Sequence, residues 1–318
     1  EGLDLMKGRY GIATNNIDPN SISTIEVLEN HQDIKALKDL KPEERASINL
    51  KLKSGVKGVF NLIATLGGGY VDKLLWDNEL ITTYFQRNSQ LLATYKGNNS
   101  GTDLESELRS HTDYDYSRTS TISDIAMPAT PGINKRYYYF NQSHSATYNQ
   151  VFRVGKNGEL GINAAYLNDR DERSNQSVTT TLLPDGSKNV VDESFNGILH
   201  RNIANGNITY MQNTERNYIK EQLKFDWLST DGYSNIYAGE DIIQENNVEN
   251  YRLHNLFHLT SRTGSDKGVE FLSKINLEKK PHSLSVAPNL FPDVIMSEQM
   301  FQSAERRNIS TENRLDFL

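Results

Sequence analysis

The sequence predicts a mainly β protein, an antiparallel transmembrane β-barrel of which about ten strands are present, preceded by a small α+β domain. Three observations support this fold class. From residue 56 onward, apolar residues recur at every second position, which is the period of a β-strand. Short and long connections alternate along the same region. The chain of 318 residues is polar, with 36% hydrophobic residues, yet it contains 16 Tyr and 11 Phe.

This composition excludes several classes of protein. A mean hydropathy of −0.63 is compatible with a membrane barrel, because alternate residues face a wet lumen and long loops face solvent. The Tyr and Phe content argues against a disordered chain, and the net charge of −7 argues against nucleic acid as a partner. No apolar run approaches the roughly 20 residues of a membrane helix, so any crossing must use strands. The absence of cysteine excludes disulfides, thiolate metal sites and cysteine catalysis.

The first region, residues 1–55, is compact and mixed in charge. A strand is predicted at 23–29, a short helical stretch at 34–39 and a second strand at 48–53, where apolar and polar residues alternate. A Ser-Gly pair then marks the boundary. The second region, residues 56–318, is the predicted barrel.

Six segments of the second region each have one apolar and one polar face. In a membrane barrel the apolar faces contact lipid and the polar faces line the lumen. The apolar faces are formed by Phe60, Leu62, Ala64, Leu66 and Tyr70; Leu160, Ile162, Ala164 and Tyr166; Leu223, Phe225 and Trp227; Tyr251, Leu253, Phe257 and Leu259; Val269, Phe271, Ile275 and Leu277; and Ile309, Leu315 and Phe317. Two further predicted strands, 75–86 and 90–96, alternate poorly.

The connections of an up-and-down membrane barrel alternate between short periplasmic turns and longer outer loops. Short turns are predicted near residues 87–89, 155–158, 229–234 and 263–268. Long outer loops are predicted near residues 97–135, 169–206, 244–250 and 279–308. The connection at 71–73 is short where this scheme requires an outer loop.

The predicted loop 169–206 contains a hairpin of its own. Residues 178–183 and 189–191 flank the turn sequence Pro-Asp-Gly-Ser at 184–187. Proline fixes φ and glycine permits positive φ, so this tetrapeptide favours a tight turn. We expect the two strands to project beyond the membrane.

Three segments of the first region resemble the late plug domain of TonB-dependent outer-membrane receptors, in particular the branch with a carboxypeptidase-regulatory-like domain ahead of the plug. The segments are Gly2-Leu3-Asp4-Leu5 with Arg9-Tyr10-Gly11-Ile12-Ala13-Thr14-Asn15-Asn16-Ile17, then Ile25-Glu26-Val27-Leu28-Glu29-Asn30-His31-Gln32, and Ala46-Ser47-Ile48-Asn49-Leu50-Lys51-Leu52-Lys53. The last takes the place of the plug strand that leads into the barrel. The motifs cover residues 1–55, which would be the C-terminal part of a plug domain, and the remainder is similar in texture.

The resemblance implies a receptor and transporter in the cell outer membrane of a Gram-negative bacterium. It would bind a nutrient at its outer loops and import it past the plug, with TonB-type energy coupling. The implied partners are outer-membrane lipid, a TonB-type energy-coupling protein, a surface lipoprotein cap, and a small-molecule, glycan or peptide ligand. Barrels of this family have about 22 strands, so roughly half would be absent.

The sequence also departs from the family pattern. No energy-coupling box is visible, and residues 40–45 replace the Gly-rich turn common between the two plug strands. The chain starts at Glu1 without a signal peptide, so we expect a processed or truncated start. These departures leave open a structural scaffold subunit that keeps the barrel but does not transport. A soluble all-β surface protein, such as an adhesin, is a third alternative.

The predicted outer loop 97–135 contains the candidate ligand-binding residues Asp113, Tyr114, Asp115 and Tyr116. Two carboxylates two positions apart can contribute to a calcium site, and tyrosine can stack on a sugar or another ligand. The alternative is a solvated loop with exposed aromatic residues.

Candidate contacts between plug and barrel are Glu43, Glu44 and Arg45, for which a solvated turn is the alternative. The run Tyr-Tyr-Tyr-Phe at 137–140 is expected to mark an interfacial aromatic girdle, with a ligand platform as the alternative.

No enzymatic chemistry is expected. His254 and His258 share one face of a predicted strand, where residues four apart are separated by about 13 Å and are too distant to share a metal ion. Nothing resembles a nucleophile with a base and an orienting group. We therefore expect no catalytic residues, no metal and no cofactor.

Overall fold

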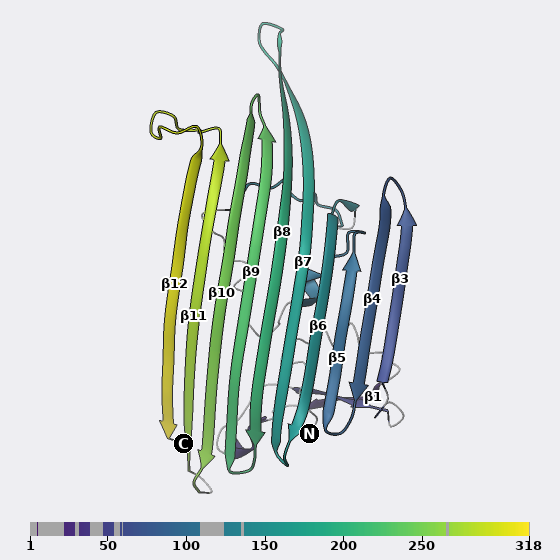
Figure 1. Ribbon diagram of the computed structural model, residues 1–318, viewed down its shortest axis with the longest axis vertical. Coiled ribbons are helices and arrows are strands. Elements are labelled where there is room, and N and C mark those ends of the chain that lie inside the picture. The colour runs from purple at the N-terminus through teal and green to yellow at the C-terminus, as the bar shows by residue number, and fades with distance from the viewer. Residues whose placement is uncertain are drawn as a thin grey trace.

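The computed structural model describes residues 5, 22–28, 32–38, 47–53, 58, 60–108, 124–134, 137–264 and 267–317. Within this part of the chain the long strands form one antiparallel sheet of ten strands, ordered β12-β11-β10-β9-β8-β7-β6-β5-β4-β3 (Figure 1). The strands are β3 (Phe60–Tyr70), β4 (Leu74–Phe85), β5 (Ser89–Asn98), β6 (Phe140–Val154), β7 (Gly158–Leu182), β8 (Lys188–Asn213), β9 (Asn217–Tyr237), β10 (Asp241–Arg262), β11 (Gly268–Ala287) and β12 (Met300–Phe317). The mainly β fold class and the strand number are therefore confirmed.

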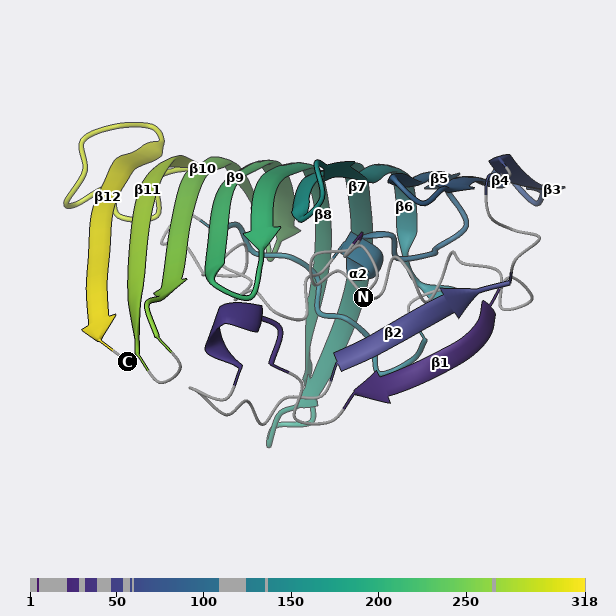
Figure 2. The same cartoon turned by 90° about the horizontal axis from the view of Figure 1, so that it is seen from below.

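The described residues of the first region form smaller elements. β1 (Ile22–Leu28) pairs antiparallel with β2 (Ser47–Leu52), and the 3-10 helix η2 (Lys35–Leu37) lies between them in sequence. The two strands and the short helical stretch predicted there are confirmed. Figure 2 shows that the ten-stranded sheet is curved and that β1, β2, η2 and the short helix α2 (Glu105–Leu108) lie on its concave side.

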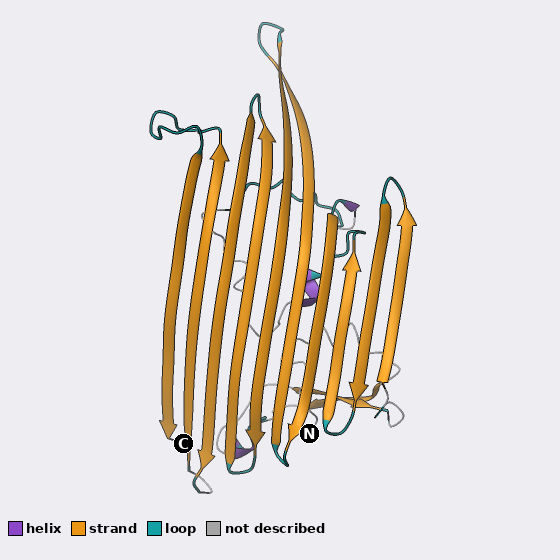
Figure 3. Cartoon of the chain, in the orientation of Figure 1, coloured by secondary structure: helices purple, strands orange, loops and turns teal. Residues whose placement is uncertain are grey.

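Each strand pairs with its neighbours in sequence, so all connections lie at the two ends of the sheet (Figure 3). The connections at the lower end are all short: 86–88, 155–157, 214–216 and 263–267. Those at the upper end are 71–73, 99–139, 183–187, 238–240 and 288–299. The two ends thus differ in loop length, but not at every connection.

Two predicted connections are wrong. Residues 229–234 lie inside β9 and residues 244–250 inside β10, while the actual turns are at 214–216 and 238–240. The Ser, Thr, Asn and Gly residues of these segments resemble turn signals, but here they belong to strands that pair on both sides. A polar stretch does not mark a loop where the strand has a polar environment on both faces.

Two predicted outer loops are much shorter than expected, for the same reason. Most of 169–206 belongs to β7 and β8, which continue to Leu182 and from Lys188. Most of 279–308 belongs to β11 and β12, leaving only 288–299 as a connection. The predicted hairpin around 184–187 is present, as the tip of two continuous strands.

The convex face of the sheet carries rows of residues that oppose one another across the strands. One such row crosses all ten strands and contains no charged residue: Leu62, Thr82, Ala93, Tyr148, Ala164, Gly206, Phe225, Leu253, Leu277 and Ile309. Its large side chains are exposed; Phe225, for example, is 44% exposed and Ile309 75%. The apolar faces predicted from periodicity thus share one side of the sheet.

The next row toward the upper end contains four aromatic residues and ends in two basic ones. Its members are Ala64, Leu80, Tyr95, Ala146, Tyr166, Ala204, Trp227, Tyr251, Lys279 and Arg307. One row higher the residues are largely polar, including Asn78, His144, Asn168, Asn202 and Glu249. The apolar part of the convex face therefore has an aromatic upper boundary.

The concave face is polar and covered. Ser143, Asn149, Thr209 and Thr260 point to this side, and each is at most 1% exposed. The sheet thus buries mainly polar side chains, together with a few apolar ones such as Leu92, Val151 and Leu167, and it exposes apolar side chains on its convex face. Among the described residues, no helix is long and apolar enough to cross a membrane.

Candidate functional site

The candidate site is the concave face of the sheet, called the inner wall below. Described parts of two segments lie on it (Figure 2): those of the first region, near the lower end of the sheet in Figure 1, and those of the connection between β5 and β6, higher up. Both are held by polar side chains of the wall strands. The site is therefore an interface between the wall and segments inside it.

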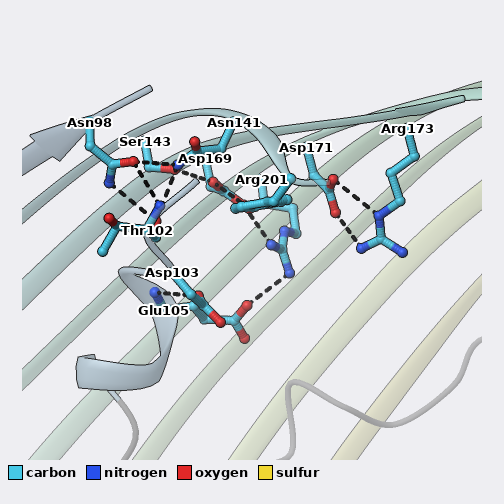
Figure 4. Close-up of polar contacts among 11 residues, drawn as sticks. Asn98, Thr102, Asp103, Glu105, Asn141, Ser143, Asp169, Asp171, Arg173 and Arg201 are labelled. Atoms are coloured by element: carbon cyan, nitrogen blue, oxygen red, sulfur yellow. Dashed lines mark hydrogen bonds and ion pairs between the residues drawn. The ribbon is translucent and has the colours of Figure 1, made fainter. Parts of the chain in front are cut away.

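The start of the β5–β6 connection is fixed by two amide side chains (Figure 4). Asn98 Oδ1 accepts hydrogen bonds from the backbone N–H of Ser100 and Thr102, at 3.2 and 3.1 Å. Asn141 Oδ1 accepts from the N–H of Gly101 at 2.9 Å, and its Nδ2 donates to Asn98 Oδ1 at 2.9 Å. Gly101 has φ +89°, a conformation that favours glycine. These contacts direct the chain inward immediately after β5.

A charged cluster follows, shown in Figure 4. Arg201 of β8 donates from Nη2 to Asp169 of β7 at 2.5 Å and from Nη1 to Glu105 of α2 at 2.9 Å. Asp169 is 3% exposed and also accepts hydrogen bonds from the hydroxyls of Ser143 and Tyr139. One arginine thus connects the wall to the inward connection through charge-assisted hydrogen bonds, the stronger class.

Tyr139 closes this cluster from the end of the same connection. Its hydroxyl lies 3.0 and 2.9 Å from the two carboxylate oxygens of Asp169. Burial, followed by the negative charges of Asp169 and Asp171, raises the pKa of Tyr139. The phenol therefore stays neutral and acts as a donor. Residues 137–140 do not form the predicted aromatic girdle as a unit, since Tyr139 is buried inward while Phe140 is exposed.

The later part of the connection, residues 124–134, also lies on the inner wall. The N–H of Ala126 donates to Gln244 Oε1 of β10 at 2.8 Å. A Cβ added at Gly197 of β8 would collide with the sulfur of Met127. A Cβ added at Gly232 of β9 would likewise collide with the Cδ1 of Ile125. Glycine at these two wall positions permits the close approach.

Side chains of the inner wall bind backbone groups of the first region. Asn163 Nδ2 donates to the carbonyl of Leu5 at 3.0 Å. Asn213 is placed similarly: its Nδ2 donates to the carbonyl of Asp33 at 2.6 Å and its Oδ1 accepts from the N–H of Lys35 at 3.0 Å. Arg262 Nη1 donates to the carbonyl of Lys38 at 3.0 Å. Beside these contacts Ala36 and Leu37 of η2 are buried.

Asn163 is itself part of a ladder of amide side chains across β6 to β9. Asn163 donates to Asn149 at 2.9 Å, Asn207 to Asn163 at 3.4 Å, and Gln222 to Asn207 at 3.0 Å. All four side chains are buried. Each amide supplies both a donor and an acceptor, so the ladder satisfies buried polar atoms from strand to strand.

Neither set of predicted site residues can be placed. Asp113, Tyr114, Asp115 and Tyr116, and likewise Glu43, Glu44 and Arg45, lie outside the described residues. The predicted loop that contains the first set does turn inward at both of its described parts.

His254 and His258, the two histidines considered as metal ligands, both lie on the inner wall. His258 Nε2 lies 2.8 Å from Glu270, and His254 Nδ1 contacts Asn276. In the described part of the chain, no three His, Asp or Glu side chains are grouped as metal ligands would be.

Sequence reasoning missed the residues that hold the inner segments, chiefly Asn163, Asp169, Arg201 and Asn213. The only sequence signal for these residues is that they lie on the polar face of predicted or actual strands. Asp169 and Arg201 are charged residues on the polar face of strands, where charges pair or face water. Assigning 169–206 to a loop concealed both of them.

No protein-family model matches the chain, and no curated protein is similar to it in sequence. The resemblance to TonB-dependent receptors therefore depends on the segments of the first region alone.

Proposed function

We propose that this chain forms part of the wall, and part of the plug, of an outer-membrane β-barrel receptor that binds a nutrient at its outer loops and imports it past the plug. The observation that carries the proposal is the inverted polarity of the ten-stranded sheet. Soluble proteins bury large apolar side chains and expose polar ones. Here Phe225, Leu253 and Leu277 are exposed while Asn149 and Asn163 are buried. Lipid outside and a polar interior account for both facts.

The dimensions of the apolar band support the same reading. On β10 the outward positions between Tyr251 and Leu259 carry Leu253, Asn255 and Phe257, and the band is interrupted there by one polar pair, in which Asn255 donates to Glu221 of β9. A tilted strand needs about 9–11 residues to cross a bilayer, and this segment has that length. Trp227 and Tyr251 would lie at the upper interface, where aromatic girdles occur.

Membrane insertion imposes a condition on the edges. β3 and β12 each pair on one side only within the described residues, and unpaired backbone groups cannot face lipid. The proposal therefore requires further strands, from this protein or a partner, to close the wall.

The way in which the first region is held is compatible with plug movement. Asn163, Asn213 and Arg262 bind backbone groups; each neutral hydrogen bond contributes only about 0.5–1.5 kcal/mol, and the charged one from Arg262 about 1.5–3 kcal/mol. Release of such a segment is within reach of an energy-coupled step. A TonB-type coupling protein and a surface lipoprotein cap remain part of the proposal through the resemblance.

The alternative is a scaffold barrel that does not transport. The Arg201 cluster favours it, because it fixes the β5–β6 connection across the inner wall and would help to keep the lumen closed. The upstream sequence of the native protein separates the two: an energy-coupling box favours transport, and a complete native chain without one favours the scaffold.

The membrane proposal is tested by fractionation of cells that make the full-length native protein, with gels of heated and unheated samples. We expect the protein in the outer-membrane fraction, with a band that shifts on heating. A protein in the soluble fraction whose band does not shift would overturn both barrel readings and favour a soluble β protein.

A further inference from the structure

The upper parts of β7 and β8 form a two-stranded ribbon that extends beyond the other strands (Figure 1). The last residue of β7 that pairs with β6 is Glu172, and the pairing of β8 with β9 starts at Ser194. Within the described residues, 173–182 therefore pair only with β8 and 188–193 only with β7, so the chain is two-stranded from the pair Ser177–Glu193 to the tip. An isolated two-stranded ribbon is marginal in water, and no other strand of the described part of the chain pairs with either of its edges.

The alternation of hydrogen-bonded and non-hydrogen-bonded pairs along the ribbon shows which residues of β7 have backbone groups on its free edge. The N–H of Leu183 donates to the carbonyl of Ser187, and at the other end the N–H of Asn213 donates to the carbonyl of Asn157. The register between these points is unbroken. Hydrogen-bonded and non-hydrogen-bonded pairs alternate along an antiparallel ladder, so odd residues of β7 bond to β8. The free edge above Glu172 therefore presents the N–H and C=O of even residues: Ser174, Gln176, Val178, Thr180 and Leu182.

The two edges of the ribbon differ in charge. Residues 174–184 contain no charged side chain, whereas the opposite edge carries Lys188, Asp192 and Glu193. Charged side chains protect edge strands from pairing with other chains, so the β8 edge is protected and the β7 edge is not. Val178 and three threonines at 179–181 also have high strand propensity.

We propose that the free edge of β7, residues 174–182, binds an extended polypeptide segment of another protein as a third strand of the ribbon. The exposed backbone groups supply affinity, as in other cases of strand addition. Val178, Val190 and Leu182 are exposed on one face of the ribbon, where they favour a partner with apolar residues at alternate positions. The edge is about 30 Å long at roughly 3.3 Å per residue.

A second copy of this chain does not fit the edge, an argument that rests on the proposed function. Copies in one membrane are related by an axis along the membrane normal. Their β7 edges would run parallel at the same height, so N–H would face N–H and C=O would face C=O. A regular ladder requires donors opposite acceptors.

The test is a binding titration with the full chain in detergent. The probe is a fluorescent peptide based on residues 188–196, which run antiparallel to β7 in the ribbon, with Lys188, Asp192 and Glu193 replaced by serine so that no charge opposes pairing with the free edge. We expect saturable binding by anisotropy and no binding of a scrambled peptide. Thr180→Pro removes an N–H from the free edge and should weaken binding about tenfold. Val190→Pro, at the cross-strand partner on the opposite edge, is the matched control and should leave binding unchanged.

Val178→Lys is a second variant that adds a protecting charge without altering the backbone, and it should also abolish binding. Absence of saturable binding, or equal weakening by Thr180→Pro and Val190→Pro, overturns the proposal. Self-association of the chain that Thr180→Pro abolishes would assign the edge to a second copy and also overturn it. Peptide binding does not require lipid, so failure here and failure of membrane insertion are separate results.

Discussion

Asp169 of β7 and Arg201 of β8 lie directly opposite each other on the inner wall, and the guanidinium of Arg201 binds Asp169 and Glu105 at the same time. Asp169 is buried, whereas the side chain of Arg201 retains 22% exposure. The pair is thus both a cross-strand contact of the sheet and the attachment point of the inward connection.

Replacing Arg201 tests this double role. We expect Arg201→Met to lower the free energy of unfolding by about 2–4 kcal/mol, because Asp169 would retain a buried charge without its cation. Because Arg201 is partly exposed, we expect this loss of stability to lie at the lower end of the range for breaking a buried ion pair. Urea unfolding in detergent measures it. The control is Arg314→Met, whose partner Asp316 is 37% exposed and whose loss should stay below about 1 kcal/mol. Equal losses in the two variants would contradict the role of Arg201.

The close approach at Gly197 gives a second prediction. Gly197→Ala places a Cβ against the sulfur and terminal methyl of Met127 and close to Pro128, so we expect Met127 to move, residues 124–134 to shift and stability to fall by about 1 kcal/mol. Limited proteolysis of the β5–β6 connection should also become faster. Gly206→Ala is the matched control, since a Cβ there meets nothing within 4 Å. Unchanged proteolysis of the Gly197 variant would mean that the connection is not held at this point.

The outer face of the sheet could be predicted from sequence, and the inner contacts could not. Phe225, Leu253 and Leu277 were assigned to apolar faces by period two, and the register places them in one row. This is possible because apolar residues recur on the same face of neighbouring strands, as the proposed contact with lipid would require of each strand. The row itself depends on pairing between strands, which periodicity alone does not give.

The inner wall has no such uniform constraint. Asn163 meets Leu5, and Arg262 meets Lys38, across long sequence separations and through backbone carbonyls. Every residue has a backbone carbonyl, so the residue type at position 5 or 38 does not indicate that a wall side chain binds there. Residues 169–177 have polar side chains on both faces, so this part of β7 gives no period-two signal, and the sequence predicts a strand again only at 178–183.

The buried phenol of Tyr139 predicts a pH dependence of stability. Its pKa is raised in the folded state by burial and by Asp169, while an unfolded tyrosine has a pKa of about 10. The contribution is therefore fully present below pH 10 and falls as pH rises above it, because the unfolded chain loses the proton first. Unfolding titrations from pH 8 to about 11 should show a decline that Tyr139→Phe reduces. An identical decline in that variant would assign the effect to other groups.

The two tryptophans give a direct test of lipid contact, since the chain has only Trp76 and Trp227. Both lie on the convex face, and Trp227 belongs to the aromatic row next to the apolar centre, whereas Trp76 lies nearer the upper end. In the Trp76→Phe variant reconstituted with brominated lipid, we expect strong quenching of Trp227 by bromine near the headgroups.

In the reciprocal Trp227→Phe variant, we expect weaker quenching of Trp76. Phe225→Trp, added to a variant that lacks both natural tryptophans, moves the indole along the outer face toward the centre of the apolar band. The strongest quenching should then shift toward bromine deep in the acyl chains. Phe225 lies one row closer to the centre of the apolar band than Trp227, so the order of quenching depths follows from the register. Indoles that respond equally to every bromine position, or to none, would mean that this face does not contact lipid and that its exposed side chains must be covered by protein.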